Sequence, residues 1–140
     1  MVFEMIHTRA DAEILLGYID TLVDSLYGLE SKSFENVAER LPSEKIAQKL
    51  IAEIKTTSKD SRKDHLRELK LLVKNCEIMK LSVAIDLDQE MIQEIVARLR
   101  EKWERLILDL EVQPEIIGGA KITWRGKYWE RTLLSKYEQI

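Results

Sequence analysis

The sequence predicts an α+β fold, in which an N-terminal helical bundle precedes a small α/β domain with a mixed sheet of about three or four strands. Two observations lead to this prediction. Up to residue 77, apolar residues recur every three or four positions, which is the spacing of one helix face. From residue 78 onward, stretches appear in which every second residue is apolar, which is typical of half-buried strands. The expected domains are residues 1–77 and 78–140.

Four helices are expected in the first domain. Residues 11–29 carry one apolar stripe made by Leu15, Ile19, Leu22, Leu26 and Leu29. A break at residues 28–33 is followed by a short apolar segment, and Pro42-Ser43 supplies a second break and an N-cap for the third helix, residues 46–54.

The fourth helix is expected to begin at Asp60 or Ser61, because either side chain can cap it. Its inward face would carry Leu66, Leu69, Leu72, Val73 and Cys76. The mixed charges between residues 59 and 74 are expected to form a solvated outer face.

The second domain is expected to begin with a strand, a helix and a strand. Alternation over residues 79–86 and 106–112 predicts the two strands. Asp88 is placed to cap the helix between them, and Leu87 and Ile92 have the spacing of a hydrophobic staple around that cap. The inner faces of the two strands match, so we expect them in one sheet.

A glycine pair introduces the third strand. Gly118 and Gly119 imply a positive φ or a close approach by another segment, and residues 120–125 alternate as a strand that Gly126 closes with a turn. A short returning strand around Tyr128 and Trp129 would then lead into a final helix. That helix is expected to start at Glu130 or Arg131 and to carry Leu133, Leu134 and Tyr137.

Composition excludes several classes of partner and location. The net charge is −3, with 22 basic and 25 acidic residues intermixed, so no single-sign field attracts nucleic acid. The apolar runs are far shorter than the roughly 18–20 residues of a membrane span, and no signal-peptide pattern opens the chain. Cys76 is the only cysteine and fits a small packed hydrophobe in a reducing compartment. We expect a cytosolic or peripheral protein with no direct membrane insertion.

The sequence contains no constellation typical of an enzyme, a cofactor site or a metal site. His7 and His65 are far apart, and we expect surface positions for both, His7 in a frayed terminus. Asp86 and Asp88 suggest a calcium loop, but the glycine and glutamate that such a loop requires are replaced by Met91 and Ala97. The glycine pair lacks the Gly-Lys-Ser/Thr of a nucleotide-binding loop. We therefore expect no catalytic residues, no cofactor and no metal.

Four stretches of the second half form an ordered combination. Residues 81–90 are an alternating strand followed by a leucine and a capped helix, and residues 112–119 combine a valine with Pro114 and Ile-Gly-Gly. Residues 122–126 are a strand and a turn, and residues 130–137 begin an amphipathic segment. Together they resemble the C-terminal part of the delta subunit of bacterial ATP synthases, the oligomycin-sensitivity-conferring protein of mitochondria. The resemblance covers residues 62–140. It departs from the family where Gln113 replaces an aspartate and where the hairpin is one residue short.

The resemblance implies a non-catalytic stator that links the catalytic head of a rotary F-type ATP synthase to its peripheral stalk and resists torque. The family normally opens with a six-helix bundle, and this chain has room for only about four helices before residue 79, so the bundle would be abbreviated. The implied partners are the alpha subunits of the head and the b-type subunits of the stalk, at the cytoplasmic face of the cell membrane.

The resemblance also suggests which residues contact these partners. The stripe of the first helix (Tyr18, Leu22, Leu26) would form the head-facing surface, and the aromatics near the glycine turn (Trp124, Tyr128, Trp129) would contact the stalk. Packing in the core is the other interpretation of each of these residues. Pro114, Gly118, Gly119 and Gly126 are the structural motif of the resemblance.

Two alternatives remain from the sequence. One is a related stator, the E subunit of a vacuolar-type ATPase or the flagellar export stator, although the breaks at residues 28–33 and Pro42 argue against the long coiled coil of those proteins. The other is a small regulatory α/β binding domain, which would need a concave pocket with convergent polar groups.

Overall fold

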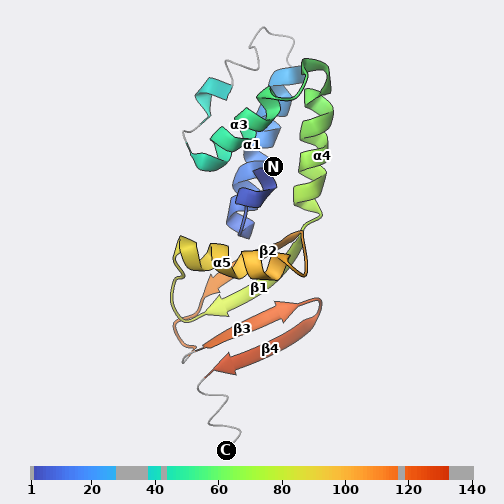
Figure 1. Ribbon diagram of the computed structural model, residues 1–140. Helices are drawn as coiled ribbons and strands as arrows, with labels where there is room; N and C mark the ends of the chain where they lie inside the picture. The colour runs from blue at the N-terminus through green and yellow to red at the C-terminus, as the bar shows by residue number, and fades with distance from the viewer. Residues whose placement is uncertain (1, 28–37, 42–43, 117–118, 133–140) are drawn as a thin grey trace, which may run out of the picture. The chain divides into compact units, whose positions relative to one another are not determined.

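The computed structural model describes residues 2–27, 38–41, 44–116 and 119–132 (Figure 1). The chain separates into two compact units: residues 1–6 with 10–75, and residues 7–9 with 76–140. The predicted α+β fold class is confirmed, since the described elements are helices followed by a four-stranded mixed sheet.

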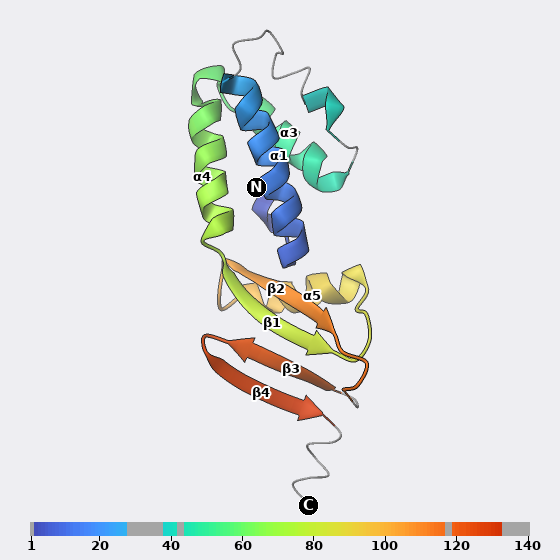
Figure 2. The same ribbon diagram turned by 180° about the vertical axis from the view of Figure 1, so that it is seen from behind.

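The first unit is helical. Its α-helices with described bounds are α1 (Arg9–Tyr27), α3 (Lys45–Lys55) and α4 (Arg62–Lys74), with short 3-10 helices at Val2–Met5 and Lys59–Ser61, and residues 38–40 are also helical. The three α-helices lie together in both views (Figures 1 and 2). Their apolar faces meet in a core of fully buried side chains, which includes Leu15, Ile19, Leu22, Leu50, Ile54 and Leu66. The helical spacing in the sequence thus predicted the buried faces of all three helices.

Several predicted details of the first unit differ in the structure. Glu44 occupies the N-cap position of α3 and makes no side-chain cap bond, while Ser43 lies outside the described residues. Ser61 precedes α4 as predicted but also makes no cap bond, because a 3-10 turn already gives it helical dihedrals. Arg62 is buried, so it does not belong to the expected solvated face.

In the described residues of the second unit, a four-stranded sheet is joined by one helix. Its strands are β1 (Glu77–Val83), β2 (Leu106–Val112), β3 (Gly119–Trp124) and β4 (Lys127–Thr132), and their order is β2-β1-β3-β4 (Figure 2). β1 and β2 are parallel, and α5 (Gln89–Arg100) connects them. β3 pairs antiparallel with both β1 and β4.

Helix α5 begins where the sequence predicted. The Asp88 side chain accepts a hydrogen bond from the Met91 backbone N–H at 2.8 Å, which is the geometry of an N-cap. Leu87 and Ile92, the expected staple, both belong to the apolar cluster of this unit. That cluster joins α5 to one face of the sheet, through Met79, Leu81, Val83, Val96, Leu106, Leu108 and Trp124.

A pairing that the sequence did not suggest extends the sheet at β2. Thr8 forms a parallel bridge with Leu108, and the Leu108 N–H donates to the His7 carbonyl oxygen at 2.9 Å. The expectation that His7 lies in a frayed terminus is therefore wrong, because its backbone is bonded to the sheet edge. His7 and His65 are both half-buried, not fully exposed.

The expected final helix does not start at Glu130 or Arg131. Both residues belong to β4, where they pair with Lys121 and Ala120 of β3. The hydrogen bonds of this ladder hold the backbone extended through Thr132. Leu133, Leu134 and Tyr137, which the prediction placed on that helix, lie outside the described residues.

Candidate protein-interaction surfaces

The stripe expected to face the catalytic head lies on α1, and its three residues differ in exposure. Leu22 is fully buried in the helical core, whereas Tyr18 and Leu26 are half-buried. The Tyr18 hydroxyl donates a 2.8 Å hydrogen bond to the carboxylate of Glu44, at the start of α3. This bond, with burial and the charge of Glu44, raises the pKa of Tyr18. The neutral phenol therefore ties α1 to α3 while its ring edge stays accessible.

Sequence reasoning missed two exposed apolar residues of the helical unit. Ile14 of α1 is 42% exposed and Leu71 of α4 is 54% exposed. Ile14 precedes Tyr18 by one helical turn, so the two lie on the same side of α1. The sequence does contain a signal for their exposure, because both residues fall outside the regular apolar stripes of their helices.

The aromatics expected to meet the stalk lie on β3 and β4 and fall into two groups. Trp124 is buried, with its ring edge-to-face against Trp103 at a centroid distance of 5.4 Å, and so belongs to the core. Tyr128 and Trp129 are 58% and 48% exposed. Because they are consecutive in a strand, their side chains lie on opposite faces of the sheet.

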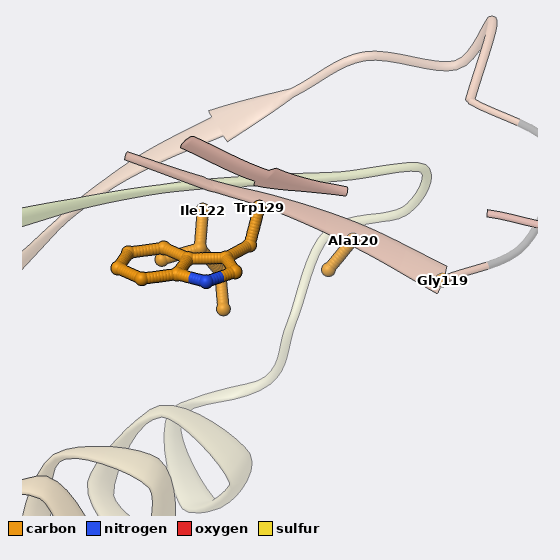
Figure 3. A pocket seen from close by; sticks show the side chains of 4 residues that line it. All are labelled: Gly119, Ala120, Ile122 and Trp129. Atoms are coloured by element: carbon orange, nitrogen blue, oxygen red, sulfur yellow. The ribbon is translucent and has the colours of Figure 1, made fainter. Parts of the chain in front are cut away.

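Trp129 lies beside an apolar hollow of about 470 Å³, whose described lining residues are Gly119, Ala120, Ile122 and Trp129 (Figure 3). Ile122 is the direct cross-strand partner of Trp129, and the indole lies along it on the same side of the sheet. This is also the face on which α5 packs, since Ala120 and Ile122 adjoin the α5 cluster. Of the four lining side chains, only that of Trp129 carries a polar atom.

The residues of the predicted structural motif shape the turns around β3. Pro114 is the second residue of a turn closed by the Ile116 N–H, which donates to the Gln113 carbonyl at 3.0 Å. Gly119 has φ +88° and Gly126 φ +77°, conformations that favour glycine. The expected positive φ is thus confirmed at Gly119, while Gly118 lies outside the described residues.

The face of the sheet opposite α5 carries charged pairs on β1 and β2. Glu111 of β2 lies 3.3 Å from the Lys80 ammonium group of β1, and Arg9 lies 3.4 Å from Asp109. Hydrogen bonds from Gln113 and Lys80, together with the charge of Lys80, lower the pKa of Glu111. These oppositely charged pairs leave no excess of one sign along this part of β1 and β2.

Cys76 is half-buried and lies between α4 and β1, not on the inner face of α4 as expected, because α4 ends at Lys74. Burial raises the pKa of its thiol, against smaller opposing effects from a backbone hydrogen bond and Arg100. The thiol therefore stays protonated and weakly nucleophilic at neutral pH.

Among the described residues, no three His, Cys, Asp or Glu side chains gather as a metal site would require. Asp88, one of the two aspartates that suggested a calcium loop, caps helix α5. The Nε2 atom of His65 lies 3.8 Å from a carboxylate oxygen of Glu53, and this one contact does not make a catalytic array.

The fold defines a small α+β protein, and several of its large apolar side chains are exposed, among them Ile14, Leu71, Tyr128 and Trp129. Residues 63–140 match the family described as ATP synthase delta (OSCP) subunit, a segment that runs from α4 through β4 to residue 140. The chain belongs to this family. A comparison with curated proteins finds no match. No helix among the described residues is long and apolar enough to cross a membrane.

Proposed function

We propose that the protein is a non-catalytic stator subunit of a rotary F-type ATP synthase, which links the catalytic head to the peripheral stalk. The observation that carries the proposal is the family match, which covers more than half of the chain and the whole strand and helix order of the second unit after Cys76. The turn at Pro114 and the glycine conformations at Gly119 and Gly126 lie within the matched segment.

A stator needs two contact surfaces and no chemistry of its own. The rotor turns within the head, so the stator must hold the head still by binding it and the stalk at once. On this proposal the residues 1–77 bind the alpha subunits of the head, and residues 78–140 bind the b-type stalk subunits. The protein would work in the cytoplasm, peripheral to the inner face of the cell membrane, and take part in proton-driven ATP synthesis as part of the complex.

The head contact is assigned to the outer side of α1. Tyr18 and Leu26 are half-buried, so each offers accessible apolar surface beside the core. Leu22 lies between Tyr18 and Leu26 in the sequence. It is fully buried and packs in the core beneath this surface. Ile14 extends the surface by one turn. A helix of the alpha subunits would pack against such a face through its own apolar stripe.

The stalk contact is assigned to the β3–β4 hairpin. Tyr128 and Trp129 are about half exposed, and large aromatic side chains of this kind dominate many protein interfaces. Trp124 fixes the hairpin to the core by its contact with Trp103. The rigid two-residue turn at Arg125-Gly126 then holds the exposed rings in a defined position.

The two alternatives are less well supported. The matched family is described as the ATP synthase delta (OSCP) subunit, and this description names neither a vacuolar nor a flagellar stator. A regulatory ligand-binding domain needs convergent polar groups in its pocket. The hollow beside Trp129 offers a single indole N–H among its described lining residues, so its chemistry suits an apolar side chain better than a small polar ligand.

The test is co-purification of the full chain with the head and stalk proteins of its own organism, scored by gel filtration. Tyr18→Ala should weaken head binding and leave stalk binding unchanged, while Tyr128→Ala should do the reverse. Asp24→Ala on α1 and Lys127→Ala on β4 are matched controls, because both residues are exposed and lie near the tested positions. Circular dichroism would show that the variants fold.

Wild-type protein that co-elutes with both partners at about one copy per head would support the stator role. Failure to bind either partner would contradict the proposal as a whole. Normal binding by both aromatic variants would leave the role standing and refute only the assigned surfaces.

A further inference from the structure

The carboxyl end of the parallel strand pair gathers three exposed apolar side chains. Val83 pairs with Val112, so β1 and β2 end side by side, and the Gln113 N–H donates to the Val83 carbonyl oxygen at 2.7 Å. Helix α5 begins at this same end of the sheet in both views (Figures 1 and 2). Ile85 of the connecting loop, Met91 of the first turn of α5 and Val112 of β2 are 71%, 47% and 42% exposed. Single exposed apolar side chains are ordinary, but a group of them at one end of a sheet favours a contact surface.

The segments that carry these side chains are acidic. No lysine or arginine occurs in residues 81–97 or 106–116, the described segments that form this end of β1, α5 and β2. The exposed carboxylates closest in sequence to the apolar side chains are those of Asp86, Glu90 and Glu115. Within the described part of the chain, none of these three forms an ion pair. The apolar surface is therefore bordered by negative charge.

The start of α5 accounts for only part of this negative charge. A helix N-terminus carries a partial positive charge of about half an elementary charge, which favours a nearby carboxylate. Asp88 supplies that carboxylate, because its side chain accepts a hydrogen bond from the Met91 N–H at 2.8 Å. Asp86, Glu90 and Glu115 thus leave an excess of negative charge beside the exposed apolar side chains.

The three apolar and three acidic residues together are called the apolar–acidic end: Ile85, Met91, Val112, Asp86, Glu90 and Glu115. We propose that the apolar–acidic end binds a basic amphipathic helix of another protein. A helix of this kind carries its apolar side chains in one stripe, with lysine or arginine beside it. The stripe covers the exposed apolar side chains, and the basic residues lie against the carboxylates around them. A helix also satisfies its own backbone hydrogen bonds, so it needs only side-chain contacts from this surface.

The charge of the apolar–acidic end argues against three other occupants. Nucleic acid and anionic lipid carry charge of the same sign and are repelled. A second copy of this chain, bound about a twofold axis, would bring two acidic patches together, because such an interface uses the same patch twice. The proposal is separate from the stator role, whose assigned contacts lie on α1 and on the β3–β4 hairpin.

The test is a titration of the isotope-labelled full chain with synthetic peptides of about 14 residues, or about four helical turns, followed by solution NMR. One peptide contains leucine at helical spacing and lysine elsewhere, and the other has glutamate in place of every lysine. The lysine peptide should shift the amide signals of residues 84–91 and 111–115, and added salt should weaken its binding. The glutamate peptide should bind about tenfold more weakly or not at all.

Substitutions separate the apolar from the charged contribution. Met91→Gln removes an exposed apolar side chain without changing the charge, so it should weaken binding of the lysine peptide about fivefold. Ile78→Gln is the matched control, because Ile78 is 46% exposed and lies near the amino end of β1, and it should leave the affinity unchanged. Asp86→Asn combined with Glu115→Gln should weaken binding about fivefold and reduce its dependence on salt.

All four substituted residues are exposed, so circular dichroism should show that the variants fold. No binding of the lysine peptide, or amide shifts confined to another face, would overturn the proposal. Equal weakening by Met91→Gln and Ile78→Gln, or equal affinity for the two peptides, would overturn it as well. These measurements use neither the head nor the stalk proteins, so their outcome is independent of the stator role.

Discussion

Arg125 is the first residue of the hairpin turn. Replacing it by alanine or by asparagine distinguishes the energetic cost of its backbone conformation from the contribution of its side-chain contacts. Arg125 has φ +48°, a left-handed conformation that costs most L residues about 1–2 kcal/mol. Its guanidinium donates to both carboxylate oxygens of Glu77 at 3.0 and 2.9 Å, and its Cζ lies 5.0 Å from the centre of the Trp124 ring. These contacts offset part of the strain, because they are made only when the residue adopts this turn.

The solvent exposure of the side chains determines how much each contact of Arg125 contributes to the free energy of unfolding. The Arg125 and Glu77 side chains are 57% and 43% exposed, so their ion pair contributes about 0.5 kcal/mol. The cation–π contact contributes about the same at an exposed site. Arg125→Ala loses both contacts and keeps the strain, so the free energy of unfolding should fall by about 1 kcal/mol. Arg125→Asn loses the same contacts, but asparagine adopts this turn easily, so it should stay within about 0.5 kcal/mol of wild type.

The assay is urea unfolding followed by tryptophan fluorescence. The chain has 3 tryptophans, Trp103, Trp124 and Trp129, and all lie in the second unit, so the emission follows the unfolding of that unit. Urea is preferred because guanidinium chloride is a salt and screens ion pairs. Combining Arg125→Ala with Glu77→Ala isolates the ion pair. Equal destabilisation by Arg125→Ala and Arg125→Asn would refute the argument from backbone strain.

Three further predictions concern the second unit. Asp88→Ala should lower the free energy of unfolding of this unit by about 1 kcal/mol, because the cap bond to Met91 is lost. Asp88→Asn should lower it by only a few tenths of a kcal/mol, and urea titration measures both changes. Glu111 has a pKa below its ordinary value of 4.5, so its stabilising effect is present above that pH and is lost as the pH falls through the lowered pKa. The free energies of unfolding of wild type and Glu111→Gln, measured from pH 7 to pH 3, should therefore become equal at the acid end. A difference between them that stays constant over this pH range would contradict the prediction. Cys76, whose thiol pKa is raised by burial, should react with iodoacetamide at pH 8 more slowly than free cysteine, and equal rates would show that it is not shielded.

Local chemistry explains which parts of the fold the sequence predicted well. The cap at Asp88 depends on residues three positions apart, and the positive φ at Gly119 depends on one missing Cβ. The alternation in β1 and β2 reflects a sheet with one face against α5. Each of these features is determined within a few residues, so a short stretch of sequence contains the necessary information.

The predictions that failed depend on residues far apart in the chain. Thr8 pairs with Leu108, a hundred positions away, and nothing in the local sequence around Thr8 indicates a partner. Glu130 and Arg131 have no strong strand preference of their own, and their extended conformation comes from the ladder with β3. Sequence also could not tell that Leu22 is fully buried while Tyr18 is not, because both fit the same broad helical stripe.

The pairing of Thr8 also affects how the head-binding role should be tested. Deletion of the first 60 residues would remove His7, Thr8 and Arg9, which belong to the second unit and bond to its sheet edge. Loss of stalk binding in such a truncated chain would therefore reflect damage to the sheet as well as loss of the helices. Single substitutions on α1 avoid this ambiguity.

Strand β4 lies at the end of the sheet order, and its composition bears on the behaviour of the protein in concentrated solution. An edge strand with exposed aromatic residues is a template on which other chains can add strands and begin to aggregate. In β4 the aromatic pair is flanked by Lys127 on one side and by Glu130 and Arg131 on the other. Stacking the same edge of two molecules in parallel register would bring like charges together at each of these positions. The charges of β4 thus oppose growth into larger β-sheet assemblies, although Tyr128 and Trp129 are exposed.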